Sequence, residues 1–481
     1  MVRGGIRGRG RGRGTGRGSV RWQPSQSVEQ STNAESTPPV ALPADRDIMA
    51  GLRPTPVGTL PVPRAHAGNA AVVIADVKQL GSCNWTGADT PTIVVPGTPR
   101  AWAEPALPLQ VEPDTGVIWD QDALSAPAGK TLVALIATVD KTHAIQCRTA
   151  HAPEMPFDWA GEQIDFVTDR TNLRKLLRWI NVNVQPPDDR DPGDDRQRKD
   201  WRINMQLAPG GRTVLFERWE KRDYTAMSGF TFGFNFETAS TTAPRGAPQS
   251  SWHHRIVSYN LNGLKIVVRF EVDAYIPAPI HRSSAGARSR ADETSSQLED
   301  LAAQLATTTI AQSAPGPAAT DVEHDFGVSP TSTRATASPE PFVQDHGITV
   351  IEGGTHIPQA ALVELTTRSA FRAQEINWAE DFPQIFLTQT PHHFLGVHHR
   401  GQFGRVIKRR LGAGELAQVE QDLQPSLLML VGALKEIAAL VRAGGARGRL
   451  TLVCRAGRVQ VYERESMESV LPDEMLERFE G

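Results

Sequence analysis

Two acidic residues lie two positions apart in the segment Gly263–Tyr275, GLKIVVRFEVDAY. Large apolar residues alternate from Leu264 to Ala274, so they share one face of a predicted strand. Carboxylates on the other face, two residues apart, point the same way at a spacing of roughly 6–7 Å, which suits a shared divalent cation such as Mg²⁺. For this pattern alone, an exposed polar strand face is the alternative. The residues of the polar face are Lys265, Arg269, Glu271 and Asp273.

A third carboxylate follows in the segment Ala361–Ser369, ALVELTTRS. The same alternation places Leu362, Glu364 and Thr366 on one face of a second strand. An acidic strand followed by a strand with Glu-x-Lys is the layout of PD-(D/E)xK nucleases, in which the acids hold metal and the lysine positions or activates the attacking water. Here Thr366 stands at the lysine position.

Two earlier segments extend the pattern: Gly233–Glu237 reads GFNFE, and Asp165–Leu177 reads DFVTDRTNLRKLL. With EVD and VELTT, in this order, they resemble the DXO-type decapping exonuclease family. That family carries an arginine in a WRGxLTKLL-like stretch, then GΦxΦE, EΦD and EΦK, where Φ is a large apolar residue. Downstream, Gln384–Phe403 (QIFLTQTPHHFLGVHHRGQF) resembles the family's QSFLxGxP…GFR…GF stretch. The resemblance covers about residues 75–465, apart from an internal insertion.

The resemblance implies an α/β (α+β) fold, with mixed, largely antiparallel sheets flanked by helices in one large domain. It also implies RNA 5′-end processing in messenger RNA decay. Family substrates are RNAs with an incomplete cap, a 5′-triphosphate, a 5′-hydroxyl or an NAD cap. Many members then degrade the RNA 5′ to 3′, and some dock onto a 5′–3′ exoribonuclease.

Residue roles follow from the resemblance as well. Glu237, Asp273 and Glu364 would bind Mg²⁺ or Mn²⁺ together with the Leu365 carbonyl, and Glu271 would hold a metal-bound water.

Arg170 and Gln384 would contact the RNA end. For Arg170 the alternative is an ion pair with Asp169 or Asp165, and for Gln384 it is ordinary strand or loop polarity.

The threonine departs from the pattern because it cannot give positive charge to the water or to the developing phosphorane. Losing such a group typically costs a factor of ~10²–10⁴ in rate. Lys265, Arg269 and Arg368 are the cations on matching strand faces, although arginine is a poor proton acceptor. Three alternatives stay open: the cation has migrated, the metal ions alone suffice, or the chain is a non-catalytic module that binds RNA ends or a partner.

Charge is distributed unevenly over the 481 residues. The net charge is −3, but residues 1–21 hold seven of the 51 Lys and Arg residues and no acid, which leaves 44 against 54 Asp and Glu in the remainder. Residues 1–18 are an RG-repeat tract whose arginines can pair with phosphate and stack on bases. A solubilising or localisation tail is the alternative. The predicted RNA-binding arginines are Arg3, Arg7, Arg9, Arg11, Arg13 and Arg17.

Composition predicts three regions: a disordered tail over residues 1–70, one nuclease-like domain over 71–280 and 346–470, and a disordered insertion over 281–345 within it. A short helix is expected near 294–305 in the insertion, and a charged loop over 186–200. The C-terminal part predicts a core-packing helix over 419–442 and strands over 450–455 and 459–464.

Several functional classes are excluded. The three cysteines form no CxxC, which argues against zinc and disulfides. No apolar run reaches 18 residues and no signal-peptide core is present, so we expect a soluble nuclear or cytoplasmic protein without a membrane partner. Asp194–Asp200 (DDRQRKD) superficially resembles a prenyl diphosphate synthase motif, but the preceding PPDDRDPG prevents a helix, so no prenyl substrate is expected.

Three adjacent histidine pairs, at 253–254, 392–393 and 398–399, lack the spacing of a shared metal site. Adjacent residues on a strand face opposite sides. Ordinary core or surface histidines are the favoured interpretation, and a single phosphate contact from His392, His393 or Arg400 is the alternative.

Overall fold

The computed structural model describes residues 42–64, 70–120, 122, 131–184, 200–244, 252–278, 343–445 and 448–480. In the range 343–445 the side chains are described from residue 346 onward. One compact unit spans Asp45–Gly481. The RG-repeat arginines, the predicted helix at 294–305 and all of the charged loop except its last residue lie outside the described residues.

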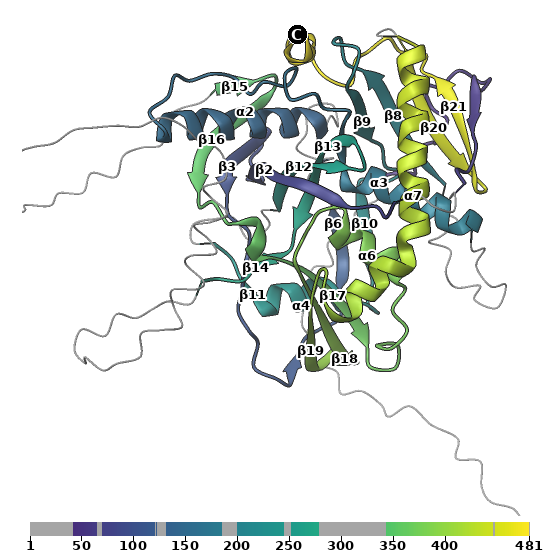
Figure 1. Ribbon diagram of the computed structural model, residues 1–481. Coiled ribbons are helices and arrows are strands. Elements are labelled where there is room, and N and C mark those ends of the chain that lie inside the picture. Colours follow the sequence, from purple (N-terminus) through teal and green to yellow (C-terminus); the bar gives the residue numbers. More distant parts are fainter. Residues whose placement is uncertain are drawn as a thin grey trace, which may run out of the picture. The chain divides into compact units, whose positions relative to one another are not determined.

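The larger sheet has twelve strands within the described residues, and Figure 1 shows it in the upper part of the picture. Strand β7 is parallel to β13 and β9, and β3 is parallel to β16, whereas the other neighbours are antiparallel. The spatial order is β1 (Gly58–Leu60), β21 (Arg458–Glu463), β20 (Arg449–Arg455), β8 (Trp201–Leu207), β9 (Val214–Arg218), β7 (Phe166–Asp169), β13 (Leu264–Val272), β12 (His253–Leu261), β2 (Ile74–Trp85), β3 (Thr92–Gly97), β16 (Ile348–Gly354) and β15 (Val343–Asp345).

The second sheet has seven strands in the described part of the chain, with β17 parallel to β18 and β14 parallel to β4. A separate ribbon pairs β6 (Thr115–Trp119) with β10 (Tyr224–Ser228). The seven strands are, in order, β11 (Thr241–Thr242), β4 (Ala101–Trp102), β14 (Ala274–Tyr275), β17 (Leu362–Ser369), β18 (His392–His399), β19 (Gln402–Arg410) and β5 (Leu109–Gln110).

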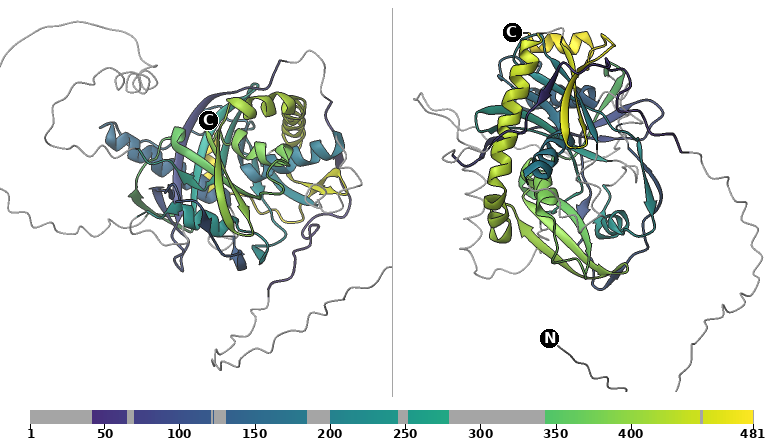
Figure 2. Two further views of the ribbon diagram at one scale, coloured as in Figure 1. Left: turned by 90° about the horizontal axis from the view of Figure 1, so that it is seen from below. Right: turned by 90° about the vertical axis from the view of Figure 1, so that its right-hand side faces the viewer.

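Helices cover both faces of the larger sheet. Helix α2 (Thr131–Thr149) packs on β2, β3 and β16, while α3 (Arg170–Val184) and α7 (Gly414–Ala443) pack on the other face (Figure 1). Helix α7 also contacts β19, so it runs along both sheets (Figure 2). The other helices in the described part of the chain are α4 (Gly233–Ser240), α6 (Trp378–Phe386), α8 (Asp473–Leu476) and the short 3₁₀ turns η2 (Gln359–Ala361) and η3 (Glu477–Phe479).

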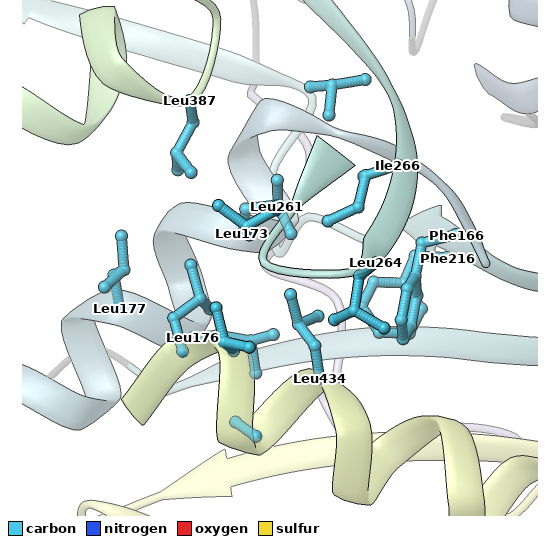
Figure 3. Close-up of a cluster of buried hydrophobic side chains, with 14 of the residues drawn as sticks. Phe166, Leu173, Leu176, Leu177, Phe216, Leu261, Leu264, Ile266, Leu387 and Leu434 are labelled. Atoms are coloured by element: carbon cyan, nitrogen blue, oxygen red, sulfur yellow. The ribbon is translucent and has the colours of Figure 1, made fainter. Parts of the chain in front are cut away.

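The main core explains the alternation in β13. Leu264 and Ile266 point toward α3 and α7, where they meet Leu173 and Leu434 (Figure 3). The intervening residue Val267 packs in a second core under α2. Both faces of β13 are therefore buried, and the alternative of an exposed polar strand face is wrong, because helices cover the sheet on both sides.

The predicted α/β class with mixed, largely antiparallel sheets flanked by helices is confirmed. The predicted C-terminal helix begins five residues earlier, at Gly414, and the two predicted C-terminal strands are β20 and β21. No helix in the described part of the chain is long and apolar enough to cross a membrane. The three cysteines are free.

Two boundaries differ from the expectation. The compact unit starts at Asp45, inside the predicted tail, because β1 pairs with β21. Strand β15 lies inside the predicted insertion and pairs with β16. Both are three-residue edge strands, and prolines surround β1, so neither segment carries a hydrophobic period that a sequence pattern can reveal.

Candidate active site where the two sheets meet

Asp273 is the single residue between β13 of the larger sheet and β14 of the smaller one. Strand β14 pairs with β17 through Ala274 and Val363. This pairing places Asp273 beside the acidic residue of β17, and the Leu365 amide donates a hydrogen bond of 2.6 Å to Asp273 Oδ2. The EVD and VELTT segments, far apart in the sequence, are thus joined directly.

Helix α4 carries Glu237, and aromatic packing fixes this helix. Phe236 is fully buried and stacks on Phe403, with ring centroids 4.3 Å apart. Gly396 on β18 makes room for them, since a Cβ there would lie 2.8 Å from Phe236 Cζ. Gly396 and Phe236 therefore set the position of the Glu237 carboxylate, which follows Phe236 in the chain.

Three of the predicted carboxylates, Glu237, Glu271 and Asp273, line one pocket of about 120 Å³. The pocket is small, with room for a few water molecules or ions. Its remaining lining residues are Arg100, Phe234, Thr238, Trp252, His253 and Val272.

Arg170 begins α3 directly after β7, whose register with β13 pairs Asp169 with Arg269. Asp169 Oδ1 accepts a hydrogen bond of 2.9 Å from the Thr171 amide, which caps the start of the helix. Arg170 Nη1 lies 3.0 Å from Glu364 Oε2, and both side chains are largely buried. Arg170 is thus paired with a predicted metal ligand.

Arg170 forms neither of the two ion pairs considered as the alternative to RNA contact. Asp165 pairs with Arg212 and Arg442, and Asp169 lies 3.6 Å from Arg269.

The cluster is electrostatically strained by like charges. Burial raises the pKa of Glu271 to about 8, and the charge of Glu237 adds to the shift. Burial also raises the pKa of Glu237 to about 7, with the charge of Glu364 adding to it. Burial, followed by the charge of Glu364, raises the pKa of Asp273 well above its usual value. Such groups gain from a nearby cation.

The guanidinium of Arg170 lies among these carboxylates, and that of Arg100 lines the same pocket as three of them. Although burial alone would lower it, the surrounding carboxylates, Glu364 first, raise the pKa of Arg170 above its usual value. Arg174, one turn further along α3, bonds to the backbone of Glu380. Burial, together with the charge of Arg170, lowers the pKa of Arg174 to about 10. The start of α3 therefore places Arg170 at this site, whereas Arg174 is bound to Glu380 of α6.

The donor set fits a hard cation in kind, because four carboxylates are the ligands that Mg²⁺ and Mn²⁺ prefer. The geometry fits only in part: among the residues that the structure describes, no three His, Cys, Asp or Glu side chains lie close enough to hold one ion. Binding would require Glu364 to exchange Arg170 for the metal. The backbone of Leu365 stands beside this set, as its amide contact with Asp273 shows.

The cations considered as lysine substitutes are engaged elsewhere. Lys265 pairs with Glu162, and Arg368 lies 2.5 Å from Asp381. Arg269 is buried against an aspartate on the α2 side of the sheet. None of the three is therefore available to replace a catalytic lysine in this arrangement.

Thr366 has a different partner. Its Oγ1 lies 2.8 Å from Nε2 of His393, which is buried on β18 directly opposite Glu364. Burial, followed by the charges of Arg409 and Arg368, lowers the pKa of His393 to about 4. This histidine is therefore neutral at physiological pH.

Gln384 lies on α6, so the alternative of ordinary strand or loop polarity does not apply at this position. The hydrophobic spacing of Trp378–Phe386 is helical, but Pro383 within it made a helix hard to predict. The backbone oxygen of Gln384 accepts a hydrogen bond from the Thr388 hydroxyl. Within the described residues no hydrogen bond joins the Gln384 side chain to the carboxylates.

An ion network that sequence patterns did not reveal lies on the α2 side of the sheet, on the same face of β13 as Glu271. Arg269 donates to both oxygens of Asp122, at 2.8 and 2.5 Å, and Arg218 pairs with Asp120 at 2.6 Å. Although burial alone would raise it, these guanidiniums, Arg269 first, hold the pKa of Asp122 well below its usual range.

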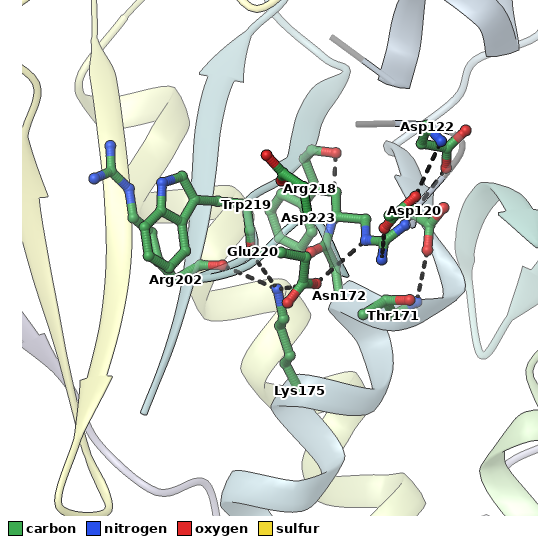
Figure 4. Close-up of polar contacts among 12 residues, drawn as sticks. Asp120, Asp122, Thr171, Asn172, Lys175, Arg202, Arg218, Trp219, Glu220 and Asp223 are labelled. Carbon is green, nitrogen blue, oxygen red and sulfur yellow. Dashed lines mark hydrogen bonds and ion pairs between the residues drawn. The ribbon is translucent and has the colours of Figure 1, made fainter. Parts of the chain in front are cut away.

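Figure 4 shows how this network continues toward α3. Lys175 donates to the Trp219 carbonyl at 2.8 Å and pairs with Glu220 at 3.0 Å, next to Arg218. Asp120 of the same network also adds to the raised pKa of Glu271, after burial and Glu237. The buried ions thus fix the loop after β9 to the helix that carries Arg170.

A family model described as "Domain of unknown function (DUF8563)" matches residues 66–479. The chain belongs to the DUF8563 family. No curated protein matches this DUF8563 protein.

Solved structures of decapping proteins are similar to it. Mutant Schizosaccharomyces pombe Rai1 in complex with 3′-FADP aligns at 12% identity and a TM-score of 0.45, over 82% of this chain and 96% of that one. Candida albicans Rai1 in complex with pU5-Mn²⁺ aligns at 10% identity and a TM-score of 0.45, over 88% of this chain and 98% of that one. Kluyveromyces lactis Dxo1 in complex with manganese aligns at 9% identity and a TM-score of 0.40, over 88% of this chain and 97% of that one.

Proposed function

We propose that this DUF8563 protein is a metal-dependent hydrolase that acts on the 5′ end of RNA. The observation that carries the proposal is the convergence of Glu237, Glu271 and Asp273 on one pocket, with Glu364 joined to it through the Leu365–Asp273 contact. Buried carboxylates with raised pKa values that share a pocket are characteristic of functional sites.

Glu237, Asp273 and Glu364 would hold Mg²⁺ or Mn²⁺ with the Leu365 carbonyl, and Glu271 would orient the attacking water. An ion bound there polarises the phosphate and stabilises the leaving oxygen. The reaction is a hydrolysis in which water bonds to phosphorus, and the bond from phosphorus to the leaving oxygen breaks.

Arg170 would change partner when the ion is bound. Its guanidinium, 3.0 Å from Glu364, would be released to donate hydrogen bonds to phosphate oxygens of the RNA end. Gln384 on α6 would contact the same end. Candidate substrates are 5′-triphosphorylated, incompletely capped and NAD-capped RNAs, with 5′–3′ degradation of the exposed RNA as a further step.

A second function is favoured by a different observation. The Arg170–Glu364 pair neutralises a metal ligand, and Thr366 stands where related nuclease patterns carry lysine. A non-catalytic module that binds RNA ends or a 5′–3′ exoribonuclease would retain such a pair. In either function the RG-repeat arginines, outside the described residues, would add an affinity for RNA that weakens with salt.

One assay separates the two functions. Purified protein is incubated with 5′-triphosphorylated and NAD-capped RNA, with Mg²⁺, Mn²⁺ or EDTA, beside the variants Asp273→Ala and Glu364→Ala. The hydrolase predicts metal-dependent product release that both variants lose while they still bind RNA. A wild type indistinguishable from both variants on every RNA end would refute the hydrolase and leave the binding module.

A further inference from the structure

Thr366 and His393 form a side-chain pair on the face of the smaller sheet that carries Glu364. Strands β17 and β18 run parallel and pair Glu364 with His393. Residues paired in this way project to one face, and Thr366 lies on it too, two residues beyond Glu364. Thr366 Oγ1 lies 2.8 Å from His393 Nε2, so a hydrogen bond joins the two side chains on this face.

The imidazole is rigidly held. His393 is 3% exposed, and its ring packs edge-on against Trp378 of α6 at 5.8 Å between ring centroids. Arg409 covers the other part of Trp378, at 5.3 Å from that ring. The histidine therefore sits under α6, where its ring has little freedom to rotate.

The hydrogen-bond inventory decides which ring nitrogen carries the proton. Nδ1 of His393 is buried and has no hydrogen-bond partner among the described residues. Since buried N–H groups without an acceptor are the rarer defect in proteins, the proton belongs on Nε2. His393 Nε2 then donates to Thr366 Oγ1, and the hydroxyl hydrogen of the threonine is left to donate elsewhere.

We infer that His393 is a positioning residue, which orients the Thr366 hydroxyl as a neutral hydrogen-bond donor toward a phosphate oxygen or the attacking water. The Thr366–His393 pair would take the role that lysine has in the Glu-x-Lys pattern of PD-(D/E)xK nucleases. It supplies a directed donor in place of a positive charge, while Arg170 of α3, 3.0 Å from Glu364, supplies a positive charge nearby. This inference rests on the proposed function.

The first test needs no activity. A sample with ¹⁵N-labelled histidine is examined by NMR, and the His393 ring is assigned as the signal that His393→Gln removes. The expected result is the Nε2–H tautomer in the wild type, with a changed Nε2 shift in Thr366→Val. An Nδ1–H tautomer, in which Nε2 accepts from the hydroxyl, would overturn the inference.

The second test uses hydrolysis of 5′-triphosphorylated RNA with Mn²⁺. Thr366→Val should lower kcat by about 10²-fold with little change in KM, as expected for the loss of one directed donor. His393→Phe should lower kcat by about 10-fold or more. His393→Gln, whose amide nitrogen can replace Nε2 as the donor, should recover most of that loss.

His392→Phe is the matched control, because the His392 ring lies on the other face of the same strand and contacts the Ala360 carbonyl. Circular dichroism and Mn²⁺ titration establish that each variant is folded and binds metal. Equal kcat in wild type, Thr366→Val and His393→Phe would contradict the inference, as would a His393→Gln variant no better than His393→Phe. A wild type without any hydrolysis would refute the proposed function. The NMR tautomer of His393 would then still show whether its Nε2 donates to the Thr366 hydroxyl, as the inference requires.

Discussion

Metal binding at the carboxylate pocket should depend steeply on pH. Glu271 and Glu237 have pKa values raised to about 8 and about 7, mainly by burial and also by neighbouring carboxylates. A carboxyl group must lose its proton before it can bind a cation, as Glu237 would, or accept a hydrogen bond from a metal-bound water, as Glu271 would, so metal binding releases protons. Affinity for Mn²⁺ should therefore rise with pH from 6 to 8 and level off above the higher pKa.

The size of the effect follows from the two pKa values. Between pH 6 and pH 8 the deprotonated fraction rises about 10-fold for a pKa of 7 and about 50-fold for a pKa of 8, so the affinity should rise about 500-fold. The same arithmetic gives close to two protons released per ion at pH 6 and about 0.6 at pH 8. Asp273, whose pKa is also raised, steepens the dependence.

Isothermal titration calorimetry with MnCl₂ at pH 6, 7 and 8 measures both quantities, because buffers of different ionisation enthalpy give the number of protons released. Glu271→Gln should release about one proton fewer at pH 6 than the wild type. An affinity that changes less than about threefold between pH 6 and pH 8, with no protons released, would refute the electrostatic reasoning.

Three further predictions concern stability, measured by urea unfolding. Gly396→Ala should cost about 1–3 kcal/mol, because its Cβ would meet Phe236 at 2.8 Å, whereas Gly404→Ala on the neighbouring strand, with nothing within 4 Å, should cost less than about 0.5 kcal/mol; equal costs would contradict the packing. Arg269→Met should cost about 3–5 kcal/mol, since it leaves a buried aspartate without its main partner, and a loss below about 1 kcal/mol would mean that the ion network is dispensable. In EDTA the folded state binds more protons at Glu271 than the unfolded state does, so the wild-type free energy of unfolding should fall as pH rises from about 4.5 to about 8. Glu271→Gln should remove this part of the fall and be about 4 kcal/mol more stable than the wild type at pH 8. A variant with the wild-type pH profile would contradict the raised pKa.

The sequence predicted the parts of the site that lie on regular strands. Alternation in β13 indicated the face on which Glu271 lies, because a strand has a fixed period of two. It did not show that the strand ends before Asp273, where the chain passes from the larger sheet into the smaller one. The order of the short motifs indicated which segments meet, and the structure does join Asp273 to Leu365. That these residues bind metal or RNA stays a prediction.

Other parts of the site depend on contacts between distant segments. The Arg269–Asp122 pair joins residues 147 positions apart, and no periodic pattern links them. The same holds for the partner of Arg170, which is Glu364 and neither of the aspartates close to it in sequence. A local sequence pattern cannot show which opposite charge a buried arginine reaches.

His393 shows a third kind of limit. As one of two adjacent histidines, it was interpreted as an ordinary core or surface residue, and only the parallel pairing of β17 with β18 places it opposite Glu364. The sequence shows a threonine at position 366, where the resembling family carries lysine, but it does not show that Thr366 has His393 as its hydrogen-bond partner.

The most direct test of the proposed function is the rate of product release from 5′-triphosphorylated RNA in Mn²⁺, measured for the wild type and for Asp273→Asn side by side. The substitution keeps the shape of the side chain and its contact with the Leu365 amide, but it removes a charge from the pocket. The hydrolase predicts metal-dependent release by the wild type and a loss of at least about 10²-fold in the variant, with RNA binding retained. Equal release by both proteins, or none by either, would contradict it.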